Sequence, residues 1–175
     1  MIKILGLDVS SVCTGYSVVE DGYLLTNTIG TIKPNSKDCI GKKLVFFEKK
    51  IKNLLKKYNP DYVVTEDIFK GPNVKTFKTL AMFRGIVFKT VYEKLKNDPV
   101  CLMPTEARKI AGVKGITKED AFIFITEKYN FLNYKFVTHN DISDSIILAL
   151  ASYYLYKNPK QNVIKKKKRK NEKSL

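Results

Sequence analysis

Hydrophobic positions along the chain change their period several times, and each change predicts an element. Residues 2–9 (IKILGLDV) are apolar on both faces, which is typical of a strand buried in the centre of a sheet. Asp21-Gly22 is a strong signal for a two-residue hairpin turn. Shorter apolar or alternating runs predict further strands over 15–20, 23–32, 61–67 and 100–103.

Elsewhere the apolar side chains recur every three or four residues and predict helices. In the first of these segments the apolar stripe consists of Leu44, Phe47, Ile51, Leu54, Leu55 and Tyr58. Thr117-Lys118-Glu119-Asp120 has the form of a capping box at the start of another helix. The predicted helices cover about 39–58, 74–96, 104–112, 117–129 and 138–156. This order of elements predicts an α/β domain, with a mixed five-stranded sheet flanked by helices.

The positive net charge of the chain predicts the kind of partner that it binds. The chain of 175 residues has 32 Lys and Arg against 17 Asp and Glu, a formal net charge of +15. Such a charge suits a polyanion, either nucleic acid or an anionic membrane surface. Residues 157–175 hold nine basic residues and one glutamate. We therefore divide the chain into a domain over 1–157 and a basic tail over 158–175. The tail is predicted to be disordered and to contact phosphates, unless it serves only to keep the protein in solution.

Several classes of protein are excluded by the sequence. The N-terminus lacks the layout of a signal peptide, and the longest apolar run, Ile146 to Tyr156, is too short to cross a bilayer. The three cysteines are odd in number and widely spaced, so neither a disulfide framework nor a zinc knuckle is expected. We expect a cytoplasmic protein with no membrane partner.

Four carboxylates lie where a metal site would need them. Asp8 and Glu66 end predicted strands on faces that are otherwise apolar, whereas Asp67 points to the opposite face. Asp141 and Asp144 are one turn apart on one face of the last helix. Clusters of oxygen ligands select Mg²⁺ or Mn²⁺, and two such ions about 3.5–4 Å apart can cleave phosphodiesters. Each acid alone could be structural, but together in a basic protein they favour a metal-dependent nuclease.

Four segments carry a resemblance to a known family. They are GLDVSSVCTGYSVV, VVTEDIF, PTEARKIAGVKGITKEDA and NDISDSIILALA. In order and spacing they resemble the RuvC family of Holliday-junction resolvases, within the RNase H-like nuclease superfamily, over about residues 1–155. The resemblance implies an RNase H-like fold and a homodimer that nicks four-way and other branched DNA in pairs of symmetric cuts. It implies Mg²⁺ or Mn²⁺ as cofactor and a role in recombination, repair or phage DNA processing.

The resemblance also implies roles for particular residues. Asp8, Glu66, Asp141 and Asp144 match the family's ligands for two metal ions. Phe69 matches an aromatic side chain that stacks on unpaired bases, although a core Phe would also fit the sequence there. The helix with Phe83-Arg84-Gly85 resembles the family's dimer helix, where Gly85 would allow close approach of two helices.

Basic residues complete the predicted interface with DNA. Lys109, Lys114 and Lys118 match the segment that holds lysines near the scissile phosphate, and Lys118 is our first choice for stabilising the transition state. His139 is expected to cap the last helix or to contact DNA. The remaining predicted DNA contacts are Lys75, Arg84, Lys165, Lys166, Lys167, Lys168, Arg169 and Lys170.

Two other functions remain open from sequence. A branched-DNA-binding protein without catalysis fits the charge equally well. An actin-like or sugar-kinase-type ATPase also opens with Gly-x-Asp, but the chain has no Gly-Gly pair for a second phosphate loop, so no nucleotide cofactor is expected. The many Lys, Asn, Ile and Tyr residues indicate an AT-rich genome, such as that of a phage, and predict broad action on branched DNA.

Overall fold

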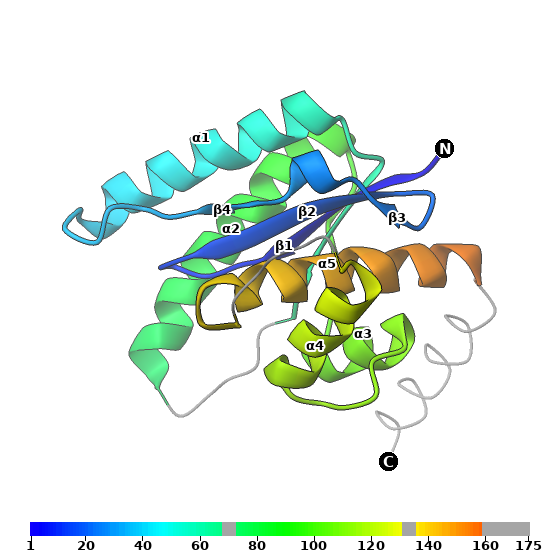
Figure 1. Ribbon diagram of the computed structural model, residues 1–175. Helices are drawn as coiled ribbons and strands as arrows, with labels where there is room; N and C mark the ends of the chain where they lie inside the picture. Colours follow the sequence, from blue (N-terminus) through cyan, green and yellow to red (C-terminus); the bar gives the residue numbers. More distant parts are fainter. Residues whose placement is uncertain (68–72, 131–135, 159–175) are drawn as a thin grey trace, which may run out of the picture.

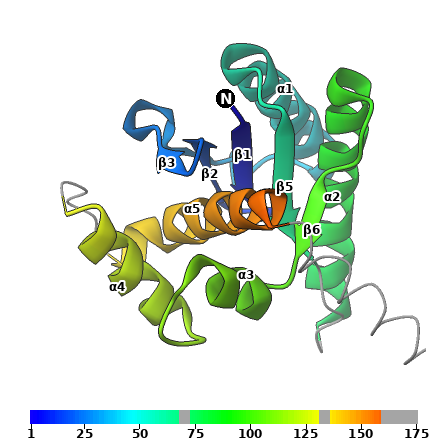
Figure 2. The same cartoon turned by 90° about the vertical axis from the view of Figure 1, so that its right-hand side faces the viewer.

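The fold is a mixed sheet between two layers of helices. The computed structural model describes residues 1–67, 73–130 and 136–158, with only the backbone described at 136–139. Figures 1 and 2 show α1 and α2 over one face of the sheet and α5 across the other, with α3 and α4 beyond α5. The strands are β1 (Lys3–Asp8), β2 (Thr14–Glu20), β3 (Tyr23–Leu24), β4 (Gly30–Ile32), β5 (Tyr62–Glu66) and β6 (Val100–Leu102). The helices are η1 (Thr26–Thr28), α1 (Ile40–Tyr58), α2 (Val74–Leu95), α3 (Pro104–Ala111), α4 (Lys118–Lys128) and α5 (Phe136–Lys157).

Strand order places the first strand at the centre of the sheet. The order is β3-β2-β1-β5-β6, and β4 also pairs with β2. β1 is antiparallel to β2 but parallel to β5, and β5 is parallel to β6. The carboxyl ends of β1 and β5 therefore lie next to each other at one edge, where ligands commonly bind in α/β proteins.

The predicted order of elements is confirmed, with one correction. The single strand expected over 23–32 is broken into β3 and β4 by η1, so the sheet has six strands. Thr28 explains the break, because its Oγ1 accepts a hydrogen bond of 3.0 Å from the amide of Val18 on β2. A side chain thus replaces the backbone partner at this point of the ladder.

Each face of the sheet has its own hydrophobic cluster. On one face, α1 buries Phe47, Ile51, Leu54 and Leu55 as its apolar stripe predicted. Phe47 lies 4.9 Å from the ring of Phe83 on α2, measured between centroids. On the other face α5 is buried over much of its length, which explains why it is apolar on all sides.

Close contact between α5 and the sheet depends on two glycines. A Cβ atom at Gly6 on β1 would collide with the carbonyl oxygen of Ser145, and one at Gly15 on β2 with that of Asp141. The backbone of α5 can therefore rest directly on β1 and β2. This brings the first turns of α5 to the carboxyl end of β1.

The predicted capping box of α4 is present: the side chain of Thr117 accepts from the amide of Asp120, and the Asp120 side chain accepts from that of Thr117. It fixes Lys118 as the first residue of the helix. None of the helices in the described part of the chain combines the length and the hydropathy that a membrane span requires.

Candidate active site

Two adjacent strands and one helix bring the predicted carboxylates together. Asp8 ends β1 and is only 5% exposed, and Glu66 ends the neighbouring strand β5. Asp141 and Asp144 lie in the part of α5 that packs on β1 and β2. Asp144 is 3% exposed. The carboxylates of Asp8 and Glu66 interact electrostatically with each other and with both aspartates of α5.

Two cationic side chains, one from α3 and one from α4, contact these acids. The ammonium of Lys118, at the start of α4, lies 3.0 Å from Asp144 Oδ2 and 3.6 Å from Asp8 Oδ2. Arg108 of α3 donates from Nη2 to Asp144 Oδ1 at 3.0 Å and from Nη1 to the carbonyl of Ile116 at 2.6 Å. The Arg108–Asp144 pair is almost completely buried, whereas the Lys118 side chain is 46% exposed.

Burial and repulsion shift the pKa values of this cluster. Burial raises the pKa of Asp8 well above its usual value, and the charge of Glu66 raises it further. The pKa of Glu66 is raised by burial and by Asp144. Burial alone would lower the pKa of Lys118, but the carboxylates of Asp8, Asp144 and Glu66 raise it above its ordinary value. Several buried carboxylates so close together are unfavourable unless cations balance their negative charge.

Cys13 interacts with Asp141, the fourth acid of the cluster. Burial raises the pKa of the Cys13 thiol to about 11, and a hydrogen bond to the Asp141 carboxylate contributes. Asp8 also acts electrostatically on this thiol. The backbone of Asp141 lies against Gly15, so Asp141 is at the β2 side of the cluster. The thiol is therefore protonated at neutral pH.

The cluster fits hard divalent cations by its chemistry. Its four acidic residues offer carboxylate oxygens, the ligand atoms that such cations prefer. Asp144 Oδ2 is buried without a well-aligned hydrogen bond. Within residues 1–67, 73–130 and 136–158, however, no three acidic, thiol or imidazole groups are close enough together to form a preassembled metal site. The Lys118 ammonium lies between Asp8 and Asp144 and balances part of their charge.

The other predicted DNA contacts fall into three groups. Lys75, Lys109 and Lys114 are exposed, on α2, on α3 and in the turn that follows α3. Arg84 is 11% exposed, and its guanidinium donates to Asp67 Oδ1 at 2.8 Å and to Cys101 Sγ at 2.9 Å. Its charge is thus paired within the protomer, and contact with DNA stays a prediction. The predictions for Phe69, for the side chain of His139 and for Lys165, Lys166, Lys167, Lys168, Arg169 and Lys170 lie outside the described residues.

Arg108 is the residue of the site that sequence reasoning missed. It is four residues from the start of α3, in the PTEARK segment, and only the fold shows that it reaches a residue 36 positions away. The available signal was a basic residue within an otherwise apolar stripe, between Ala107 and Ala111. A buried arginine at such a position requires an acidic partner.

Comparisons with known proteins agree with this geometry. The family model described as "Crossover junction endodeoxyribonuclease RuvC" matches residues 4–152. The RuvC of Ehrlichia chaffeensis is 34% identical over 157 residues, 87% of this chain and 97% of that protein. The RuvC of Syntrophomonas wolfei is 34% identical over 159 residues, 89% of this chain and 91% of that protein.

Solved structures share the fold. A Thermus thermophilus RuvC in complex with a Holliday junction substrate superposes with a TM-score of 0.75 at 14% identity, over 90% of this chain and 96% of that one. The yeast mitochondrial Holliday junction resolvase superposes with a TM-score of 0.58 at 14% identity, over 86% of this chain and 77% of that one. The fold class predicted from sequence is thereby confirmed. With the match over residues 4–152, the chain belongs to the RuvC family of crossover junction endodeoxyribonucleases, which are divalent-metal-dependent.

Proposed function

We propose that this chain resolves four-way and other branched DNA junctions by paired symmetric nicks, as a homodimer that uses two Mg²⁺ or Mn²⁺ ions per site. One observation carries the proposal: acids of β1, β5 and α5 interact electrostatically at one end of the sheet, where a half-exposed lysine and a buried arginine pair with two of them. The chain that holds this acidic cluster has a net charge of +15. A basic protein attracts DNA, and its acidic centre attracts the cations that cleave a phosphodiester.

Asp8, Glu66, Asp141 and Asp144 are the residues that would hold the ions. When bound, divalent cations activate water and stabilise the leaving oxygen of a phosphodiester. The resemblance to the RuvC family implies a 5′ phosphate and a 3′ hydroxyl as products. The chain's own residues position these groups: β1 and β5 fix Asp8 and Glu66, and α5 brings the aspartates of its first turns to them.

Lys118 and Arg108 divide the positive charge of the site between two roles. Lys118 is long and half-exposed, so its ammonium can turn from Asp8 and Asp144 to a DNA phosphate and stabilise charge in the transition state. Arg108 is buried and bonded at two points, to Asp144 and to the backbone of Ile116. We assign it a positioning role, since it fixes the rotamer of Asp144 and is closed off from DNA.

The outer surface of α2 supports the homodimer. Phe83, Val87 and Val91 face the core, so they are not available to a partner. Met82 is 49% exposed and Tyr92 is 54% exposed on the opposite side of the helix. A Cβ atom at Gly85 would meet nothing within 4 Å in the protomer, so the glycine leaves room for a second helix.

A cleavage assay on synthetic four-way junctions tests this function. The junctions carry cores of several sequences, and each is incubated with Mg²⁺, with Mn²⁺ or with EDTA. We expect paired nicks at symmetric positions in both metals, none in EDTA and none in a linear duplex of the same sequence. Nicks spread over many core sequences would support broad action on branched DNA, and nicks confined to one short motif would contradict it.

The Asp8→Asn protein separates a nuclease from a protein that only binds junctions. We expect it to bind the junction with nearly wild-type affinity and to cut at least about a hundredfold more slowly, a loss typical of removing one group that acts on the transition state. Tight binding by the wild type with no cutting in either metal would overturn the proposed nuclease.

A further inference from the structure

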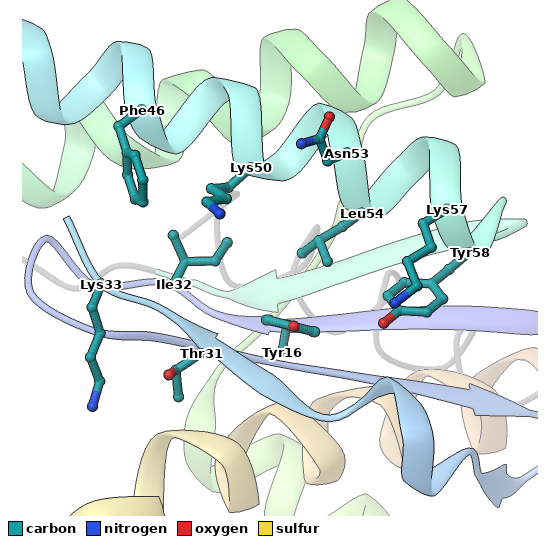
Figure 3. Close-up of a pocket in the computed structure, with 10 residues that line it drawn as sticks. All are labelled: Tyr16, Thr31, Ile32, Lys33, Phe46, Lys50, Asn53, Leu54, Lys57 and Tyr58. Atoms are coloured by element: carbon teal, nitrogen blue, oxygen red, sulfur yellow. The ribbon is translucent and has the colours of Figure 1, made fainter.

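A basic groove lies on the face of the sheet opposite the active site. It has a volume of about 410 Å³ between α1 and the edge formed by β2 and β4. Figure 3 shows side chains of α1 descending towards the strands, while Tyr16 lies on the floor. The lining residues are Tyr16, Thr31, Ile32, Lys33, Phe46, Lys50, Asn53, Leu54, Lys57 and Tyr58.

The lining combines positive charge with accessible aromatic rings. It includes Lys33, Lys50 and Lys57 but no acidic residue. None of these lysines forms an ion pair with a residue that the structure describes, whereas Lys52 of α1 and Lys89 of α2 share Glu48. The ammonium of Lys57 lies 5.0 Å from the ring centroid of Tyr58. Unpaired lysines beside partly exposed rings are typical of surfaces that bind nucleic acid.

Spacing favours a polymer over a single anion. Lys50 and Lys57 are seven residues apart on α1, which puts them about 10 Å apart along the helix axis on one side. A single phosphate would require both lysine side chains to bend towards one point. Successive phosphates of a chain can meet each ammonium group without this, and the bases would then lie against Phe46, Tyr16 or Tyr58.

Lys33 connects the groove with the margin of the active site. It lies just beyond β4, and in Figure 3 its side chain points away from α1. The neighbouring residue, Ile32, pairs with Thr14 at the start of β2, the strand whose Gly15 lies against Asp141 of α5. Lys33 thus lies at the β4 edge, between the groove and the end of the sheet that carries the acids.

We propose that this groove binds single-stranded DNA, with phosphates on Lys50 and Lys57 and a base stacked on Tyr58. It receives a strand that leaves the active site around the β4 edge. The proposal rests on the proposed function in that the ligand is DNA, but it assigns a second contact surface that takes no part in cleavage.

Binding of a fluorescent dT12 oligonucleotide in EDTA tests the groove independently of cutting. Two double variants of the full chain are compared by anisotropy over a series of salt concentrations. Lys50→Gln/Lys57→Gln removes groove lysines, and Lys49→Gln/Lys56→Gln removes the same charge from the same helix outside the groove. All four side chains are exposed, so both variants should fold.

We expect the groove variant to bind dT12 about tenfold more weakly and to lower the slope of log K against log[salt] by about 1.4, the value for two phosphate contacts on a single strand. The control variant should lose less than about threefold. Tyr58→Leu should weaken binding by about fivefold or more without changing the salt slope. Equal losses of dT12 affinity in the two double variants would overturn the proposal that the groove binds single-stranded DNA. Unchanged dT12 affinity of Tyr58→Leu would overturn it as well.

Duplex DNA and cross-linking locate the strand. A twelve-base-pair duplex should show the same affinity for both double variants, and a loss as large as that for dT12 would overturn the assignment to single strands. An oligonucleotide with 5-iododeoxyuridine should cross-link under ultraviolet light to Tyr16, Phe46 or Tyr58, as found by mass spectrometry. Cross-links confined to other peptides would overturn the proposed position. If the groove experiments gave the expected results but the protein did not cleave junctions, the proposed nuclease activity would be contradicted and the proposed groove would not.

Discussion

Burial of carboxylates sets the chemistry of single residues in this site. Asp8 and Asp144 are almost inaccessible, and among the described residues Lys118 and Arg108 form ion pairs with them. Burial raises the pKa of Asp8 and of Glu66, so at neutral pH their negative charge costs folding free energy. The site is thus held in a state that favours capture of cations at the expense of stability.

Replacing Asp8 with Asn should therefore stabilise the protein although it slows cleavage at least about a hundredfold. When folding raises the pKa of an acid, the protein becomes less stable as pH rises from the unfolded-state pKa of that acid to its folded-state pKa. For Asp8 the unfolded-state pKa is near 3.8. In EDTA at pH 7 we expect Asp8→Asn to melt a few degrees above the wild type, about 2–4 °C per kcal/mol. Near pH 3.5 the difference should become small, because Asp8 is then neutral in the folded state and mostly neutral in the unfolded state. Thermal melts at both pH values check this.

A lower melting temperature for Asp8→Asn at pH 7 would contradict this account. It would mean that the contact of Asp8 with Lys118, at 3.6 Å, stabilises the fold by more than burial of the charge costs. Asp67→Asn is the matched control, because Asp67 lies one residue beyond Glu66 but pairs with Arg84 outside the cluster. It should not show the increase.

At the scale of elements, the site depends on how closely α5 lies on the sheet. Gly6 and Gly15 remove the side chains that would hold the helix away from β1 and β2. The carbonyl oxygens of Ser145 and Asp141 occupy that space. The separation of helix and sheet, and hence the position of both aspartates, is therefore encoded in two strand residues.

Gly6→Ala should push α5 from the sheet and damage stability and cleavage together. The new methyl group meets backbone, which cannot rotate away, so we expect a loss of about 1–3 kcal/mol in the free energy of unfolding. Urea denaturation and the junction assay check both effects.

Gly41→Ala in α1 is the control for Gly6→Ala. A Cβ atom there meets nothing within 4 Å, so the helix should gain up to about 1 kcal/mol. Equal stability of the two alanine variants would contradict the close approach of α5.

At the scale of the whole molecule, the two faces of the sheet divide the work. α5 covers one face, and α1 and α2 cover the other (Figures 1 and 2). The acids lie on the α5 side, whereas the basic groove and the exposed apolar side chains of α2 belong to the other side. A homodimer through α2 would join two such protomers without blocking either α5. Two nicks in one junction require such an arrangement of two active sites.

Gly85→Arg tests the homodimer at that surface. The space around Gly85 is open within the protomer, so the folded monomer accepts the larger side chain. In the proposed dimer the arginine would meet the partner helix, and we expect the sedimentation equilibrium mass to fall from two chains to one. Gly85→Ala should shift it less. A wild-type protein that sediments as a single chain at micromolar concentration would contradict the dimer.

Much of the fold was predictable because local signals were strong. Asp21-Gly22 ended one strand and began the next, and Asn59 and Pro60 marked the end of α1. The apolar stripe of α1 correctly predicted its buried face. The break between β3 and β4 was not predictable, since it depends on a hydrogen bond from Val18 to Thr28, ten residues away.

For the site, the sequence by itself determined which residue types are present and at which element ends they stand. Asp8 and Glu66 follow apolar strands, and Asp141 and Asp144 are spaced for one helix face, all of which local periodicity records. Only the tertiary structure decided the partners: Arg108 for Asp144, Asp67 for Arg84, and Lys118 between two acids. These are contacts between residues distant in the chain, and burial, which determines their strength, exists only after the helices have packed on the sheet.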